Sequence, residues 1–264
     1  PNAQEVASGI VNGYNSGIHS FTIIGSYGTG KSCFLLALEK DLQSKGQHNL
    51  INPQTLSSCK KYEVLKIVGD YKDLASLMRN KLAIDGTADN VLDELRNRYN
   101  QAKKRGSFLI IFIDEFGKVL EHAAKNDPEQ ELYFMQKLAE FVNVPTRQIL
   151  LVTTLHQNFS AYARKLSSVQ KEEWNKVKGR FKELVFIEPV EQLLYLASKQ
   201  NGSCKDLGEN ASGLNKLCQL AKDTKFLSDG LSFETTEALY PLEPFSAYAI
   251  TQAIQRYGQN ERSL

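Results

Sequence analysis

The stretch GSYGTGKS, at residues 25–32, constrains the fold of this chain more than any other feature of its sequence. It follows directly on residues 21–24, an aromatic and β-branched run that predicts a buried strand. Behind it, residues 31–42 carry apolar side chains at helical spacing. The stretch therefore matches the pattern GxxxxGK[ST] between a strand and a helix, the setting that gives this pattern its meaning. The alternative is a glycine-rich turn that matches by accident.

The glycines let the backbone curl so that successive N–H groups point inward at phosphate oxygens, and the helix N-terminus adds its positive dipole end. Lys31 is expected to reach the β- and γ-phosphates of a nucleotide and so to take part in catalysis. The Ser32 hydroxyl is expected to bind Mg²⁺. The residues expected to bind the nucleotide are Gly25, Ser26, Tyr27, Gly28, Thr29, Gly30, Lys31, Ser32 and Cys33.

Strand and helix patterns alternate behind this stretch. SFLIIFID, at residues 107–114, gives the strongest strand pattern, because six consecutive apolar residues suit a central parallel strand covered on both faces. Further strands are expected at residues 62–68, 149–154 and 184–187, and helices at residues 72–83, 90–104 and 128–142. The alternation predicts a three-layer α/β fold, with a parallel sheet between two layers of helices.

The pattern changes near residue 189. Helices are expected at residues 190–197, 214–221 and 245–257, with a loop at residues 198–213, and no buried strand pattern recurs. We therefore expect a nucleotide-binding core over residues 1–188 and a small all-helical lid over residues 189–264. Because the chain starts at Pro1 and ends without a helix stop, we expect it to be a piece of a longer protein.

The composition is that of an ordinary globular chain, with 42% hydrophobic and 23% charged residues. A net charge of +2 does not by itself argue for nucleic acid, although Lys103, Lys104 and Arg105 could form a local basic patch. The four cysteines form no CxxC pair and are expected to be reduced thiols. Since no apolar stretch is long enough for a membrane span, we expect a cytoplasmic protein with no membrane partner.

Two carboxylates end the strand predicted at residues 107–114. A chain that hydrolyses a nucleotide needs one carboxylate near the metal and usually a second that polarises water. Asp114 is expected to hold Mg²⁺ through its water shell, and Glu115 to act as the general base. The alternative is a strand that merely ends in two solvated carboxylates.

Polar residues also follow the next predicted strand. His156 is the first candidate for orienting the attacking water and Thr154 the second, although His156 could be an ordinary loop residue. Arg180 comes just before the last predicted strand. It could form a surface ion pair, or it could project into the nucleotide of a neighbouring subunit and stabilise transition-state charge there.

The motifs GSYGTGKS, IIFIDE, VTTLHQN and GRFKELVFIEP, followed by a helical region, resemble the AAA+ family of P-loop ATPases over nearly the whole chain. The resemblance implies ATP and Mg²⁺ as cofactors, a sheet order of 5-1-4-3-2 and a helical lid. It places His156 at the sensor-1 position, where Asn is commoner, and Arg180 at the arginine-finger position. Arg262 is the candidate for the sensor-2 arginine of the lid, with Arg256 behind it.

A narrower resemblance is carried by FIDEFGKVLEHAAKNDPEQELYFMQKLAEF, TTLHQNFSAYA, VKGRF and YPLEPFSAYAITQAIQRYGQNERSL. These segments look like the ATPase regions of large prokaryotic proteins from phage-defence and restriction loci, including the BREX-type P-loop proteins. The resemblance implies an N-terminal motor or switch module of a longer, DNA-directed defence protein. The expected partners are further copies of the chain in a homo-oligomer or a larger defence complex, and DNA is a further candidate.

Three functions stay open at this point. The first is an ATPase that assembles into rings or filaments and couples turnover to work on DNA or on an effector. The second is an ATP switch with slow turnover, which changes the exposure of an effector. The third is a DNA-binding ATPase of the replication-initiator type, for which the sequence has no recognisable helix-turn-helix or strongly basic helix.

Overall fold

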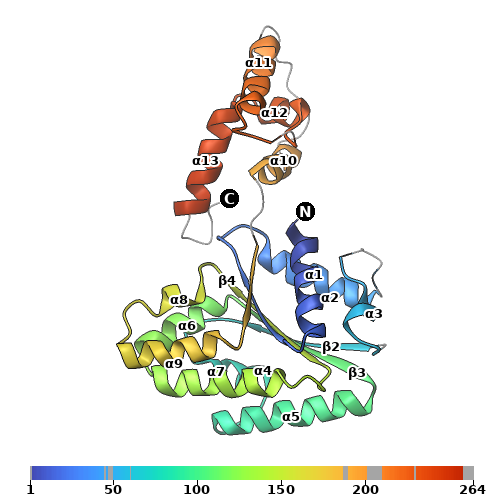
Figure 1. Ribbon diagram of the computed structural model, residues 1–264, viewed down its shortest axis with the longest axis vertical. Helices are drawn as coiled ribbons and strands as arrows, with labels where there is room; N and C mark the ends of the chain where they lie inside the picture. The colour runs from blue at the N-terminus through green and yellow to red at the C-terminus, as the bar shows by residue number, and fades with distance from the viewer. Residues whose placement is uncertain are drawn as a thin grey trace. The chain divides into compact units, whose positions relative to one another are not determined.

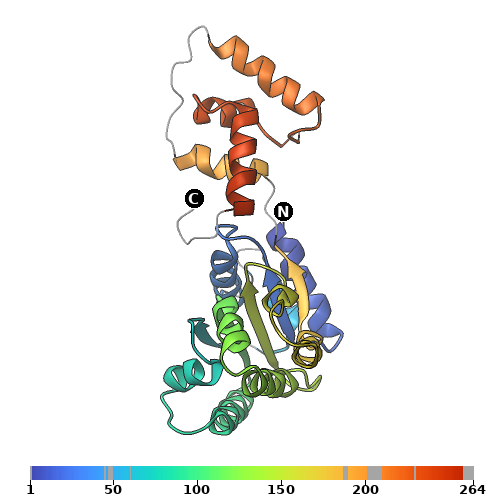
Figure 2. The same ribbon diagram turned by 90° about the vertical axis from the view of Figure 1, so that its left-hand side faces the viewer.

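The computed structural model describes residues 2–44, 46, 50–59, 61–186, 190–200, 210–228 and 230–257. The chain forms two compact units, one of Pro1–Ser26 with Gly30–Phe186 and the other of Tyr27–Thr29 with Ile187–Leu264. The first unit contains the sheet, and the second contains only helices among its described residues (Figures 1 and 2). The roles of core and lid remain predictions for these units.

Five parallel strands form one sheet in the order β2-β3-β4-β1-β5. Their bounds are β1 (Ser20–Ile24), β2 (Lys61–Val68), β3 (Ser107–Asp114), β4 (Ile149–Leu155) and β5 (Lys182–Val185). Counted from the β5 edge, the order is the predicted 5-1-4-3-2. The register pairs Ile24 with Leu155 on one side and with Val185 on the other, so the loop after β1 begins between two neighbouring strand ends.

Helices cover both faces of this sheet (Figure 1). In β3, Phe108, Ile110 and Phe112 pack in the apolar cluster of α1 to α3, whereas the residues between them pack against α4 to α9. This alternation follows from the two-residue period of a strand. The helices of the first unit are α1 (Asn2–Asn15), α2 (Lys31–Gln43), α3 (Pro53–Leu56), α4 (Leu74–Leu82), α5 (Ala88–Lys104), α6 (Phe116–Lys125), α7 (Pro128–Val142), α8 (Phe159–Tyr162) and α9 (Ser168–Lys178). The predicted three-layer arrangement is confirmed.

Several elements differ from the sequence-based expectation. Helices α1, α3, α6, α8 and α9 were not predicted. In α1, a Cβ at Gly13 would lie 2.6 Å from the Phe21 ring, so the glycine that weakens the helix pattern is what allows close packing on β1. The last strand was expected at residues 184–187, but β5 spans Lys182–Val185. Its side chains are mostly half-buried at a sheet edge, so the apolar run did not mark its start.

The second unit has its own apolar cluster, which includes Val190, Leu194, Cys218 and Leu227. Its helices are α10 (Val190–Gln200), α11 (Asn210–Asp223), α12 (Phe233–Leu239) and α13 (Pro244–Tyr257). The loop expected at residues 198–213 is shorter, because both of its ends are helical. Helix α12 was not predicted, and the predicted boundary at residue 189 lies outside the described residues.

Glu131 of α7 is a buried acid, with 8% of its surface exposed. Its Oε2 accepts a 3.3 Å hydrogen bond from the backbone N–H of Leu74, the first residue of α4. Burial, with a smaller contribution from the Asp73 and Asp127 carboxylates, raises the pKa of Glu131 from 4.5 to about 7. The folded chain therefore binds more protons here than the unfolded chain between these two pH values, so its stability falls as the pH rises through this window.

We expect Glu131→Gln to raise the melting temperature at pH 8 and to leave it nearly unchanged at pH 4. The amide keeps an acceptor for Leu74 and removes the cost of a buried charge, which is at most about 3 kcal/mol at about 1.4 kcal/mol per pKa unit. Thermal melts at the two pH values measure the difference, with the exposed Glu129→Gln as the control. An equal gain at both pH values would contradict the assignment to ionisation.

Candidate nucleotide site

The loop between β1 and α2 has the curled backbone that the sequence predicts. Gly25 is buried, and its N–H donates to the Leu155 carbonyl at the end of β4 at 3.0 Å. Gly28 and Gly30 have φ angles of 75° and 88°, in the left-handed region that glycine enters without strain. A Cβ at Gly30 would meet no atom within 4 Å, so conformation and not space requires glycine there. Gly30 is also the N-cap of α2, which places the helix N-terminus at this loop.

Lys31, the first residue of α2, folds back over the loop. Its Nζ donates to the carbonyl oxygens of Gly25 and Ser26, at 2.6 and 2.7 Å. Burial lowers the pKa of Lys31 to about 8, while the carboxylates of Asp114 and Glu115 act in the opposite direction. The lysine and the two carboxylates predicted from separate motifs therefore interact electrostatically in the fold.

Asp114 is held at the end of β3 by its neighbour on β4. Its Oδ1 accepts a 2.6 Å hydrogen bond from the Thr154 hydroxyl and a 3.0 Å bond from the backbone N–H of Glu115. The N–H of Glu115 also donates to Thr154 Oγ1 at 2.9 Å. Thr154, the second candidate for the position that orients water, is fully buried and hydrogen-bonds the Asp114 carboxylate.

The oxygen atoms of Asp114 and Ser32 suit Mg²⁺ better than a metal ion that takes all of its ligands from protein side chains. Among the described residues, no group of three His, Cys, Asp or Glu side chains is arranged to hold a metal ion. Mg²⁺ usually keeps several waters and takes one or two carboxylates together with phosphate oxygens. Asp114 and the exposed hydroxyl-bearing Ser32 provide hard oxygen donors of this kind.

Glu115 lies in a turn that few residues adopt. Its φ and ψ are 53° and 35°, and it is the N-cap of α6. A non-glycine residue in this region is held there by its surroundings, at a cost on the order of 1 kcal/mol. Its Oε2 pairs with Lys118 Nζ at 2.6 Å, one turn into α6, and its side chain is 36% exposed. The predicted general base is therefore partly accessible and ion-paired.

His156 follows β4 and is partly buried. Its Nδ1 lies 3.0 Å from the Tyr162 hydroxyl, and the two rings meet edge to face at 82°. Burial lowers the pKa of His156, and the positive charge of Lys31 lowers it further. The imidazole is therefore neutral at physiological pH and lies within electrostatic reach of the loop lysine.

Arg180 lies between α9 and β5, and its contacts are with α7 and α9. Its Nη2 pairs with Glu140 Oε1 at 2.7 Å, and its Nη1 donates to the Lys176 carbonyl at 3.0 Å. The structure thus does not bring Arg180 together with Lys31 and Asp114. Arg262 lies outside the described residues, and the side chain of Arg256 is not described either.

Two glycines at the site were not recognised from the sequence. The N–H of Gly69, directly after β2, donates to the Asp114 carbonyl at 2.7 Å, and a Cβ there would lie 2.3 Å from the Glu115 carbonyl oxygen. A Cβ at Gly117 would lie 2.3 Å from the Tyr162 hydroxyl. A glycine directly after a predicted strand was the available signal for Gly69, but one sequence does not reveal what approaches it.

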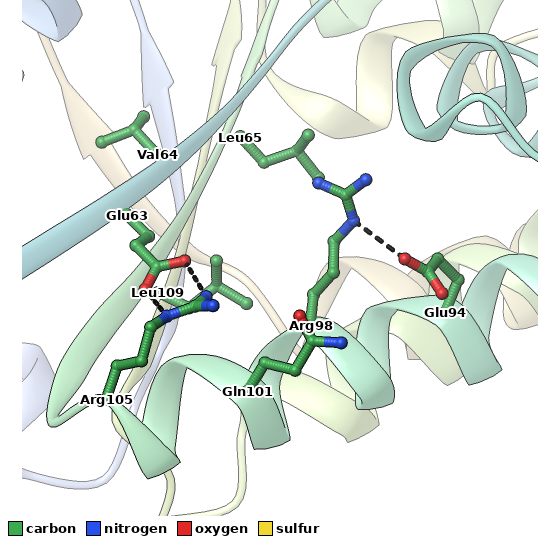
Figure 3. Close-up of a pocket in the computed structure, with 8 residues that line it drawn as sticks. All are labelled: Glu63, Val64, Leu65, Glu94, Arg98, Gln101, Arg105 and Leu109. Atoms are coloured by element: carbon green, nitrogen blue, oxygen red, sulfur yellow. Dashed lines mark hydrogen bonds and ion pairs between the residues drawn. The ribbon is translucent and has the colours of Figure 1, made fainter.

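A hollow of about 310 Å³ lies between β2 and α5 (Figure 3). Arg105 holds Glu63 through two hydrogen bonds of 3.0 and 2.7 Å, and Arg98 holds Glu94 at 3.1 Å. These charges are paired within the chain. Because β2 is an edge strand and two strands separate it from β1, the hollow is not part of the candidate nucleotide site.

The strand, glycine loop and helix, with a carboxylate at the end of a further parallel strand, define a P-loop NTPase. The sequence model described as ATPase family associated with various cellular activities (AAA) matches residues 21–174, which is more than half of the chain. The chain therefore belongs to this family, and the predicted AAA+ resemblance and its nucleotide-binding class are confirmed.

Several solved structures are similar to the chain. The Aeropyrum pernix ORC2 protein (ADPNP-ADP complexes) is 15% identical with a TM-score of 0.48, and the match covers 88% of this chain and 65% of that one. Drosophila ORC bound to DNA is 13% identical with a TM-score of 0.47, over 97% and 55%. Domain III of the Thermotoga maritima replication initiation protein DnaA is 14% identical with a TM-score of 0.41, over 90% of each chain.

The chain spans less than two thirds of the length of the ORC2 chain. No curated protein matches it. Within the part of the chain that the structure describes, every helix is too short or too polar to cross a membrane.

Proposed function

We propose that this chain binds ATP and hydrolyses it, and that a neighbouring copy of the chain completes the hydrolytic site. The observation that carries the proposal is the placement of Asp114 and Glu115 at the end of β3, where both carboxylates act on the charge of Lys31. A protein that only senses nucleotide does not need a base beside the metal carboxylate. The loop recognises phosphates, and ATP as the nucleotide follows from the family.

Each residue has a role in this proposal. Lys31 binds the β- and γ-phosphates, and Ser32 and Asp114 would hold Mg²⁺, which would neutralise phosphate charge. Glu115 takes the proton of the attacking water, and its carboxylate is ion-paired with Lys118 in the single chain. His156 orients the water or a phosphate oxygen as a neutral hydrogen-bonding group. Thr154 keeps Asp114 in place.

Arg180 is the candidate for the residue donated to a neighbouring subunit. It is 29% exposed, and its ion pair with Glu140 holds the guanidinium at the surface of α7. Such an exposed pair contributes little stability, so the arginine can leave it when a nucleotide of another subunit offers stronger charge. The arginine in trans then stabilises charge that develops in the transition state.

We expect Arg180→Ala to leave ATP binding unchanged and to lower turnover of the assembled protein about 1000-fold. Phosphate release at high protein concentration measures the loss, and ATP binding is measured by equilibrium titration. Lys171→Ala, which removes an exposed cation from the neighbouring helix α9, is the control and should keep wild-type turnover. Unchanged turnover in Arg180→Ala would exclude the assignment.

One experiment tests the proposal as a whole. The ATPase rate per chain is measured against protein concentration, with and without double-stranded DNA. A rate per chain that rises with concentration supports assembly, and a further rise with DNA supports DNA as the target. A rate that stays constant and does not respond to DNA argues against both.

For the biological setting we propose a module of a larger cytoplasmic protein in prokaryotic anti-phage defence, acting on DNA or on an effector. The support is the resemblance of FIDEFGKVLEHAAKNDPEQELYFMQKLAEF and the other quoted segments to the BREX-type proteins. Loss of protection against phage infection in cells that carry Glu115→Gln, in the full-length protein, tests this setting. Full protection by that variant would argue against it.

An ATP switch with slow turnover is the second candidate. It is favoured by the ion pairs of the single chain, because Glu115 is held by Lys118 and Arg180 by Glu140. A burst of about one phosphate per chain followed by slow product release would indicate the switch. Steady turnover without a burst would indicate the motor.

A further inference from the structure

We propose that Tyr162 is the positioning residue for His156: its hydroxyl donates to Nδ1 and thereby keeps the imidazole proton on Nε2, as a donor toward the nucleotide. The inference rests on the proposed function, in which His156 acts on a phosphate oxygen or on the attacking water. The sequence does not reveal which ring nitrogen of His156 carries the proton.

The geometry of the pair allows the Tyr162 hydroxyl to donate to His156 Nδ1. The Tyr162 hydroxyl and His156 Nδ1 are 3.0 Å apart, within hydrogen-bonding distance. A neutral imidazole has one N–H donor and one acceptor nitrogen, so a ring that accepts at Nδ1 carries its proton on Nε2. Burial and the Lys31 ammonium both disfavour the doubly protonated ring. A donor at Nε2 suits an anionic phosphate oxygen, which cannot itself donate.

Tyr162 is fixed by the packing of α8. The helix begins at the N-cap Asn158, whose Oδ1 accepts from the Ala161 N–H at 2.9 Å. Trp174 donates to the Phe159 carbonyl at 2.9 Å, and the ring of Phe159 packs against the rings of Trp174 and Phe181. Tyr162 itself is only 7% exposed. A buried phenol generally has a hydrogen-bond partner, and a rigid one can hold that partner in a single orientation.

Gly117 provides the space in which the two rings meet. A Cβ at this position would lie 2.3 Å from the Tyr162 hydroxyl and 3.1 Å from His156 Nδ1. Gly117 is in the first turn of α6, two residues after the proposed base Glu115. The start of α6, the end of β4 and helix α8 therefore converge on the Tyr162 hydroxyl.

Loss of a purely structural residue would lower the melting temperature, whereas loss of a positioning residue would lower kcat. We expect Tyr162→Phe to keep the melting temperature within a few degrees, to change the ATP Kd less than about twofold, and to lower kcat of the assembled protein about tenfold at unchanged KM. In the His156→Ala background the same change should have no further effect on kcat, because the residue that it positions is gone. The exposed Tyr133→Phe is the matched control.

The ring nitrogens give a readout that does not depend on turnover. With ¹⁵N-labelled histidine, and His156 assigned from the His156→Ala variant, we expect the wild-type ring at pH 7 to carry its proton on Nε2. Tyr162→Phe should shift this tautomer population. An unchanged population, or an equal loss of kcat in both backgrounds, would overturn the inference. Absence of any ATPase activity would refute the proposed function alone, because the nitrogen shifts still test the positioning.

Discussion

The Glu115→Gln variant is expected to bind ATP with wild-type affinity and to hydrolyse it at least about 100-fold more slowly. An amide cannot take a proton from water, so the chemical step loses its base. The turn itself should persist, because Glu115 is anchored through its backbone N–H to Asp114 and Thr154. Phosphate release under saturating ATP measures the loss of turnover, and equilibrium titration measures the retained affinity.

Glu121→Gln on the same helix is the matched control, because it removes the same charge from α6 away from the turn. It should keep wild-type turnover. If Glu115→Gln retained more than half of the wild-type rate, another group would have to be the base. If it also lost ATP binding, Glu115 would be part of the binding site and its role in catalysis would need a different test.

A single methyl group at Gly69 is expected to cost the first unit about 1–3 kcal/mol and to lower turnover. The added Cβ would lie 2.3 Å from the Glu115 carbonyl oxygen, and neither backbone can move without disturbing the hydrogen bond from Gly69 to Asp114. The displacement would shift both proposed catalytic carboxylates. Misplacement of such groups by about 1 Å costs on the order of 100-fold in rate.

Urea unfolding measures the stability of Gly69→Ala. The chain has one tryptophan, Trp174, which is fully buried in the first unit and reports on its unfolding. Gly213→Ala in α11 of the second unit is the control for a methyl group added away from the site, because its Cβ would meet no atom within 4 Å. It should leave the unfolding midpoint reported by Trp174 unchanged. If Gly69→Ala had the wild-type urea midpoint and full turnover, the turn after β3 would have to accommodate the added methyl group without strain, which would contradict the prediction.

The parts of the site that could be predicted are those with a continuous local pattern. The loop at residues 25–32 and the carboxylates after residues 107–113 follow apolar runs that mark buried strands, and the ends of parallel strands meet at one edge. In the fold the charges of Asp114 and Glu115 both act on Lys31, which agrees with the loop and the carboxylates lying at one edge of the sheet. The sheet order followed from the resemblance to the AAA+ family and was confirmed.

The parts that could not be predicted depend on contacts between distant segments. Gly69 matters because the chain at Glu115 passes within van der Waals distance, and Tyr162 because α8 places its hydroxyl against His156 and Gly117. In α1, the glycines that let the helix approach the sheet also interrupt the apolar pattern by which a helix is recognised in the sequence. At Gly69 and in α1 the residue type is set by a neighbour remote in sequence. Tyr162 contacts His156, which is only six residues earlier, but the turn that brings the two together is not contained in a helix or strand pattern.

The two hydrogen bonds from Lys31 to the carbonyls of Gly25 and Ser26 make ligand entry an exchange reaction. An incoming anion must interact with the Lys31 ammonium group more favourably than the two carbonyl oxygens do. We expect a lone small anion to compete poorly, because it replaces those bonds with about the same number. A polyphosphate presents several adjacent charged oxygens and can also bind the loop amides. The position of the Lys31 side chain without ligand therefore favours extended anions over small ones.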